Sequence, residues 1–250
     1  SRQGAQSKQV RAQRLPPAAP AVPAMALLAS GVLRALLVLA PAAPRGVAAI
    51  AALSPALLAG VRQAHEALVP TSLGDMRVRH YGDGGGGDIA VALHGAGHQD
   101  WIQHEWDPVA AALEDAGFTV LLPNLHSVDG VSAASPEDLS HALRQLVAWA
   151  AAGAGSGRGT PSAAPALPLL LGKSWGGALA ARVAALPSSP VERLVLVAPA
   201  LRDDDGTLAV ACPAAVFCAK DDPMIKHAAL WHQILHDEVS FTTAPHGGHR

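Results

Sequence analysis

The most constraining feature of the sequence is an apolar run that ends abruptly at a serine. Residues 169–171 are all leucine, residues 172–176 read Gly-Lys-Ser-Trp-Gly, and an alanine-rich stretch with helical spacing follows directly. This pattern predicts a strand, a very tight turn and a helix, with Ser174 at the apex. Such a turn leaves no room for side chains on either flank, which explains the glycines. It also strains the serine backbone and places its hydroxyl at a helix N-terminus, where N–H groups favour negative charge.

Residues 172–176 fit G-x-S-x-G, the motif that places a nucleophilic serine between a strand and a helix. The letters Gly-Lys-Ser also end the phosphate-binding loop G-x-x-x-x-G-K-[ST], which needs a glycine at position 167. That position is Leu167, and the predicted strand runs straight into Gly172. The sequence therefore argues against a nucleoside triphosphatase.

Charge is distributed unevenly along the 250 residues. Seven of the 18 Lys and Arg precede Glu66, the first acid, so residues 66–250 carry 11 basic and 20 acidic side chains. This part of the chain lacks the basic patch that nucleic acid would require, so we expect no nucleic acid partner. Two cysteines are too few for a disulfide framework, and Cys218 is predicted to be a buried thiol in a strand.

Residues 1–53 are predicted to be an N-terminal targeting or disordered segment. Their apolar stretch, residues 26–40, contains Arg34 and no acid, which is typical of organelle-targeting or secretory signals. It is short for a membrane-spanning helix. We therefore expect an organellar or secreted protein, with a cytoplasmic one as the alternative, and membrane contact only through this segment.

Residues 54–73 are predicted to form a docking helix and a linker. Ser54 and Pro55 have the pattern of a helix start, and side chains as far as His65 and Leu68 recur at helical spacing. The main domain is then expected at residues 74–250.

Short apolar runs alternate with helical patterns through this domain. Runs that are apolar throughout are typical of strands buried on both faces, so we expect an α/β fold with a mostly parallel central sheet and helices on both faces. Ligands of such sheets lie beyond the carboxyl ends of the strands. The polar clusters at predicted strand ends are residues 94–98, 124–126, Ser174, 221–222 and 246–249.

Three of these clusters resemble motifs of the α/β-hydrolase family, in its compact, cap-less serine hydrolase form. Leu-His-Gly-Ala-Gly at residues 93–97 resembles the family's oxyanion-hole loop. Ala-Lys-Asp-Asp-Pro at residues 219–223 resembles its acid turn, and His-Gly-Gly-His at residues 246–249 resembles its histidine turn. The resemblance covers about residues 74–250. It implies a serine esterase or thioesterase that acts on a small-molecule or acylated substrate and needs no metal or organic cofactor.

A serine hydroxyl becomes a good nucleophile only when a base removes its proton and a third group orients that base. In this fold the chain order is serine, acid, histidine. The resemblance implies that Ser174 is the nucleophile, Asp222 the acid and His249 the base. Asp221 and His246 are the alternatives for the acid and the base.

The resemblance also implies an oxyanion hole made by the backbone N–H groups of Ala96 and Trp175. Lys173, directly before the serine, is expected to point into solvent, and the alternative is that it favours negative charge nearby. The remaining histidines close to predicted strand ends show no metal-site spacing and are expected to be surface residues. They are His98, His104 and His126.

The sequence departs from the family pattern in two places. Only residues 201–213 separate two predicted strands where many relatives insert a cap, so we expect no cap domain and an open site. The sequence stops one residue after His249, where relatives continue with a helix, so we expect a truncated sequence without that C-terminal helix. The predicted reaction is ester or thioester hydrolysis through an acyl-serine, and the rival interpretation is a catalytically weak or inactive scaffold that acts as a binding protein.

Overall fold

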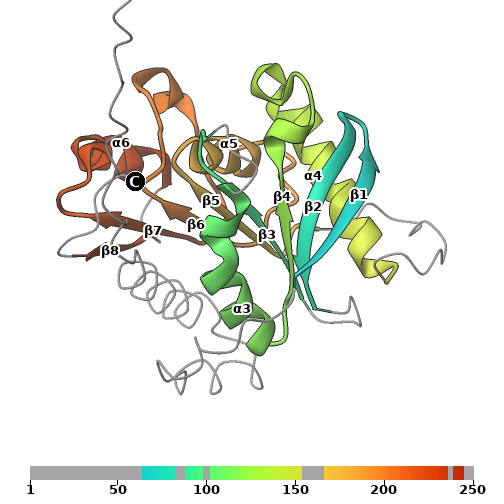
Figure 1. Cartoon of the computed structure of the whole chain (residues 1–250). Coiled ribbons are helices and arrows are strands. Elements are labelled where there is room, and N and C mark those ends of the chain that lie inside the picture. Colours follow the sequence, from blue (N-terminus) through green and yellow to red (C-terminus); the bar gives the residue numbers. More distant parts are fainter. Residues whose placement is uncertain (1–63, 83–87, 98–101, 154–165, 236–238, 245–250) are drawn as a thin grey trace, which may run out of the picture.

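The computed structural model describes residues 64–82, 88–97, 102–153, 166–235 and 239–244. Its strands are β1 (His65–Thr71), β2 (Gly74–Tyr81), β3 (Ile89–Leu93), β4 (Thr119–Pro123), β5 (Leu169–Lys173), β6 (Leu194–Val197), β7 (Ala214–Ala219) and β8 (Val239–Ala244). They form one eight-stranded sheet in the order β1-β2-β4-β3-β5-β6-β7-β8 (Figure 1). All neighbours from β4 to β8 are parallel, whereas β2 is antiparallel to both β1 and β4. The prediction of a mostly parallel sheet is confirmed.

Helices lie on both faces of this sheet, as predicted. The α-helices are α3 (Asp107–Asp115), α4 (Pro136–Ala151), α5 (Ser174–Ala184) and α6 (Ala228–Leu235). The 3₁₀ helices are η2 (Ile102–Trp106), η3 (Leu125–Ser127), η4 (Val131–Ala133), η5 (Asp203–Thr207) and η6 (Pro223–His227).

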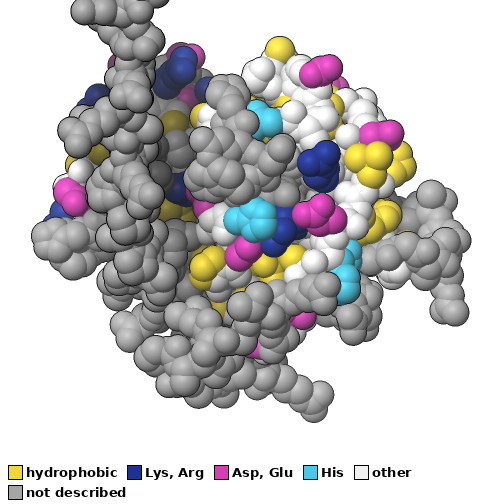
Figure 2. Space-filling model, in the orientation of Figure 1, with side chains coloured by type: hydrophobic (Ala, Val, Ile, Leu, Met, Phe, Trp, Pro, Cys, Tyr) yellow, Lys and Arg dark blue, Asp and Glu magenta, His cyan; other side chains and the backbone are white. Residues whose placement is uncertain are grey.

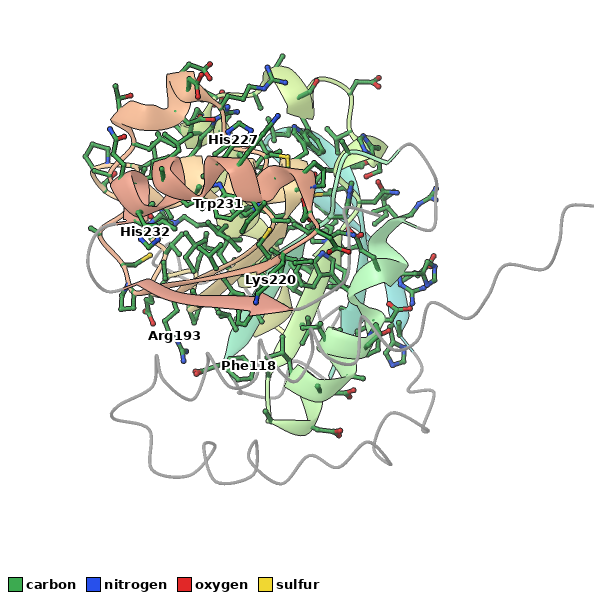
Figure 3. All side chains as sticks on the ribbon, turned by 90° about the vertical axis from the view of Figure 1, so that its left-hand side faces the viewer. Phe118, Arg193, Lys220, His227, Trp231 and His232 are labelled. Carbon is green, nitrogen blue, oxygen red and sulfur yellow. The ribbon has the colours of Figure 1, made fainter. Side chains whose placement is uncertain are left out.

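The side chains of β3 show how each face is filled. Successive side chains of a strand point to opposite faces. Ala90 and Ala92 pack into the cluster that includes α3, while Val91 and Leu93 pack into the cluster that includes α4, α5 and α6. Figure 3 shows α6 lying over the sheet beside β8, and its Trp231 is fully buried in the second cluster. The sheet is therefore buried on both faces, which accounts for strands without a polar side.

The carboxyl ends of the central strands are aligned at one edge of the sheet. Gly172 of β5 pairs with Leu93 of β3 on one side and with Leu196 of β6 on the other. This register brings the turns that follow β3, β5 and β6 together, which is where a parallel sheet places its ligands.

The prediction of a helix that includes His65 and Leu68 is wrong, because these residues belong to strand β1. β1 pairs antiparallel with β2 from His65 opposite His80 to Thr71 opposite Gly74. Val69 is buried while Leu68 is 64% exposed, which is the two-residue period of a strand. Since β1 is part of the sheet, the domain also begins before residue 74. Residues 54–63 lie outside the described part of the chain.

A network of charged side chains fastens α3 to β2. Arg79 of β2 donates two hydrogen bonds to the carboxylate of Asp107, at 3.2 and 3.1 Å, and His104 Nδ1 lies 2.9 Å from the same carboxylate. Figure 2 shows basic, acidic and histidine side chains side by side on the face that α3 and β2 share. This network fixes the end of η2, the segment that leads into α3.

Candidate functional site

Ser174 lies at the tight turn that the sequence predicts, directly after the last residue of β5 and as the first residue of α5. Its φ is 51°, in the left-handed region that costs a residue other than glycine free energy. A Cβ on Gly172 would lie 2.5 Å from the carbonyl oxygen of Gly176, and one on Gly176 would lie 2.3 Å from that of His94. A side chain at either glycine would therefore clash with main-chain atoms, which cannot move aside as a flexible side chain could.

The same geometry excludes the phosphate-binding loop. Gly172 is a paired residue of β5, and Leu167 is fully buried just before the strand. A P-loop needs a wide glycine-rich turn in front of its lysine, and here that space is taken by strand backbone. The sequence argument against a nucleoside triphosphatase is thus supported by the pairing.

Residues 94–97, which we term the 94–97 loop, follow β3 and lie directly beside Ser174. A Cβ on Gly95 would lie 3.6 Å from the Cβ of Ser174. His94 fixes the conformation of this loop, because its Nε2 accepts a hydrogen bond from the N–H of Leu125 at 2.9 Å. Its Nδ1 must then carry the proton, which it donates to the carbonyl oxygen of Gly95 at 2.7 Å. A buried, neutral imidazole thus links the loop after β3 to the loop after β4.

Burial lowers the pKa of His94 below its ordinary value of 6.5. Below about pH 7, His94 binds a proton in the unfolded chain, whereas in the folded chain it stays neutral until a lower pH. The free energy of unfolding therefore falls as the pH falls through 6.5. We expect His94→Gln to flatten this dependence between pH 7.5 and pH 5.5. Urea denaturation at three pH values in that range measures the slope.

The control for this prediction is His141→Gln. His141 is exposed on α4 and takes no part in the link between the 94–97 loop and the loop after β4, so this variant shows the effect of replacing a histidine away from that link. His80 is also buried, and its pKa is lowered mainly by burial. Part of the pH dependence of stability therefore remains in both variants. An equal slope for His94→Gln and His141→Gln would contradict the neutral, buried state of His94.

The two residues predicted to form the oxyanion hole belong to the two segments that lie beside each other at the serine, α5 and the 94–97 loop. Trp175 is the second residue of α5, and N–H groups of the first helical turn have no partner within the helix. Ala96 lies in the 94–97 loop and is exposed. The N–H of Gly95 is already bonded to Glu105 Oε1 at 2.9 Å. Because the N–H of Gly95 is already bonded, Ala96 is better suited than Gly95 to donate to a ligand.

Lys173 does not point into solvent, so that prediction is wrong. Its side chain is 18% exposed, and its ammonium group forms an ion pair with the carboxylate of Glu105, whose side chain is 10% exposed. The alternative, that Lys173 favours negative charge near the serine, stays a prediction, because its ammonium group is paired with Glu105. The two residues are 68 positions apart in the chain, a separation at which sequence spacing carries no signal.

Burial distinguishes the two candidate acids after β7. Asp222 is 4% exposed, whereas Asp221 is exposed. Asp222 Oδ1 accepts a hydrogen bond from the N–H of Met224 at 2.8 Å and thereby caps η6, with Pro223 following as the first helical residue. Near this turn Cys218 is a free, buried thiol, as predicted, and burial with the adjacent carboxylates raises its pKa to about 12.

His246 and His249 lie outside the described residues, as does His98. The structure therefore places the serine turn beside the 94–97 loop and the Asp222 turn at the end of β7, two strands away from β5 in the sheet, and the predicted base lies outside the described residues. Among the residues that it describes, no group of three or more His, Cys, Asp or Glu could bind a metal ion. Within the same residues, no helix has the length and apolar character needed to cross a bilayer.

His126 is exposed, as predicted, but it is not an isolated surface residue. Its ring stacks on that of Trp175, with 5.3 Å between centroids and 9° between planes, and lies 5.0 Å from the ring of His94. Sequence reasoning missed this stack as well as Glu105. The position of His126 at a strand end was the available signal for the stack, whereas nothing in the spacing pointed to Glu105.

Comparison with known proteins finds similarity at the level of three-dimensional structure and none at the level of sequence families. No protein-family model matches the chain, and no curated protein does. Among solved structures the chain is similar to a CIB-like hydrolase from Thermoplasma acidophilum, at 13% identity and a TM-score of 0.55 over 75% of this chain and 89% of that one. It is also similar to XC6422 from Xanthomonas campestris, described as an α/β serine hydrolase without lid, at 19% identity and a TM-score of 0.54 over 74% and 85% of the two chains.

A third similar structure is Thermogutta terrifontis esterase 2 phosphonylated by cyclosarin, at 16% identity and a TM-score of 0.53 over 76% and 85% of the two chains. The chain has the α/β-hydrolase fold. In the α/β-hydrolase fold a G-x-S-x-G serine stands on a strained strand-to-helix turn at the carboxyl edge of the sheet, the position that Ser174 occupies. Since a fold hosts many functions, the reaction has to be argued from the residues of the site.

Proposed function

We propose that this protein is a serine hydrolase that cleaves carboxylic esters or thioesters through an acyl-Ser174 intermediate. The observation that carries the proposal is the strained backbone of Ser174, with φ 51°, at the start of α5 and beside the 94–97 loop. Strain of this kind persists only where the surroundings enforce it, and it is concentrated at functional sites. The hydrolase and esterase names of the structural neighbours agree with this proposal.

In the proposed reaction the Ser174 hydroxyl oxygen attacks the carbonyl carbon of the substrate while His249 takes up the hydroxyl proton. The negative charge that develops on the carbonyl oxygen is stabilised by the N–H groups of Ala96 and Trp175. The proton on His249 then passes to the leaving alcohol or thiol, and Asp222 orients the imidazole throughout. Water attacks the acyl-Ser174 by the same steps and releases the acid.

His246 and Asp221 are the alternative base and acid. The mechanism uses a hydroxyl, an imidazole, a carboxylate and two backbone N–H groups, and it requires no metal or organic cofactor. Burial and the capping bond make Asp222 the better-fixed carboxylate of the pair, which suits an orienting role.

The proposal is tested by covalent labelling with a fluorophosphonate probe. We expect the full chain to be labelled and Ser174→Ala to remain unlabelled, because the probe reacts with an activated serine. Ser188→Ala, which alters an exposed serine, is the matched control and should be labelled like the unaltered protein. Equal labelling of Ser174→Ala would overturn the proposal, and no labelling of the unaltered chain would favour a non-catalytic scaffold. A series of p-nitrophenyl esters of increasing acyl length then defines the substrate.

A further inference from the structure

Glu105 joins the two segments that flank Ser174. Its Oε1 accepts a hydrogen bond from the N–H of Gly95 at 2.9 Å, and its Oε2 accepts one from the ammonium group of Lys173. Lys173 directly precedes the serine, and Gly95 lies across from it in the 94–97 loop. The carboxylate of Glu105 therefore joins the 94–97 loop to the residue that precedes Ser174.

Glu105 is itself held in place by its neighbours in the chain. Trp106 is 1% exposed, and its indole N–H donates to the carbonyl oxygen of Leu93 at 3.2 Å. Asp107 is bonded to Arg79 of β2 at 3.1 Å. With both following residues fixed to the sheet, the carboxylate of Glu105 is presented to Gly95 and Lys173 from a rigid support, which a mobile surface pair would lack.

The partners of Glu105 stand next to the two proposed oxyanion donors. Ala96 follows Gly95 directly, and Trp175 lies two residues after Lys173. Oxyanion donors stabilise a transition state only when they are fixed at about 2.7–3.1 Å from the position of the developing charge. We propose that Glu105 is a positioning residue that sets the distance between these two donors by binding the loop on one side and the turn on the other. This role rests on the proposed serine hydrolase function.

Glu105→Gln tests the role with little change of shape. The amide lacks the negative charge that attracts Lys173, and it accepts a weaker hydrogen bond from Gly95. The distance between the two proposed oxyanion donors is then no longer fixed. Because complete removal of one oxyanion donor lowers kcat by about 10²–10³, we expect misplacement to lower it roughly 10-fold to 100-fold, with KM changed little. Lys173→Met keeps the Gly95 bond and is expected to lose less. The double variant should be no worse than Glu105→Gln, since Lys173→Met removes a connection that Glu105→Gln has already weakened.

The matched control is Arg182→Gln. Arg182 also lies on α5 and forms a partly buried ion pair, with its Nε 2.8 Å from Asp205 Oδ1, but at the opposite end of the helix from Ser174. We expect it to lower the Tm while leaving kcat unchanged, whereas Glu105→Gln lowers kcat in excess of any change in Tm. An unchanged kcat for Glu105→Gln, or an equal kcat loss for Arg182→Gln, would overturn the positioning role. Turnover by Ser174→Ala equal to that of the unaltered protein would instead overturn the proposed function itself.

Discussion

Ser174→Ala is expected to lower kcat for ester hydrolysis by about 10⁴-fold to 10⁶-fold, since loss of the nucleophile leaves only binding and the oxyanion donors. The free energy of unfolding should stay nearly unchanged, because alanine has the same Cβ and the same cost at φ 51°. Steady-state kinetics with a p-nitrophenyl ester and urea denaturation measure the two effects. Retention of more than about 1% of kcat would place the nucleophile elsewhere.

A companion variant, Ser174→Gly, tests whether the turn is strained for the sake of reactivity. Glycine adopts a left-handed φ without a steric cost, so we expect this variant to be inactive but more stable, by about 1 kcal/mol. A gain of stability together with a loss of activity is the sign of a backbone held in an unfavourable conformation to expose a hydroxyl. A stability below that of the unaltered protein would argue that the serine side chain contributes more to folding than its conformation costs.

The serine turn could be predicted from the sequence because all of its determinants are local. An apolar strand, two glycines and a helix start lie within one short segment, and Gly172 and Gly176 report a close approach of backbone to backbone. The same holds for the polar residues at strand ends, because parallel strands bring those ends together whichever order the strands take. The confirmed parts of the fold are thus the ones that depend on short-range pattern and on general sheet geometry.

The remaining features depend on pairings that the spacing of a single segment does not reveal. β1 is a strand because its backbone pairs with β2, although the spacing of His65 and Leu68 also fits a helix. Lys173 is turned inward by Glu105, whose presence beside the serine is set by the position of η2. The two errors have different causes. β1 pairs with the adjacent strand of the same hairpin, and its ambiguous spacing is read as helical when it is taken alone, whereas the partner of Lys173 is 68 positions away and carries no motif.

Gly176→Ala is expected to destabilise the protein by about 3 kcal/mol or more. In an exposed helix the change from glycine to alanine would be stabilising by about 1 kcal/mol. Here the new Cβ would lie 2.3 Å from the carbonyl oxygen of His94 and 2.6 Å from that of Leu93. Both atoms belong to the main chain, so the contact can be relieved only by moving α5 away from the end of β3, and the clash outweighs the gain in helix propensity.

Gly206→Ala is the matched control, because its nearest contact would be a flexible side-chain atom of Leu230 at 3.5 Å, and we expect a change within about 0.5 kcal/mol. Gly177→Ala, with its Cβ 3.0 Å from Cα of Pro199, should fall between the two. Urea denaturation of the three variants gives the order, and equal stability of Gly176→Ala and Gly206→Ala would contradict the predicted clash.

The approach of α5 to the end of β3 is also what brings Trp175 next to the 94–97 loop. Any Gly176→Ala protein that still folds should therefore lose kcat as well, because the atoms that require glycine also set the spacing of the proposed oxyanion donors.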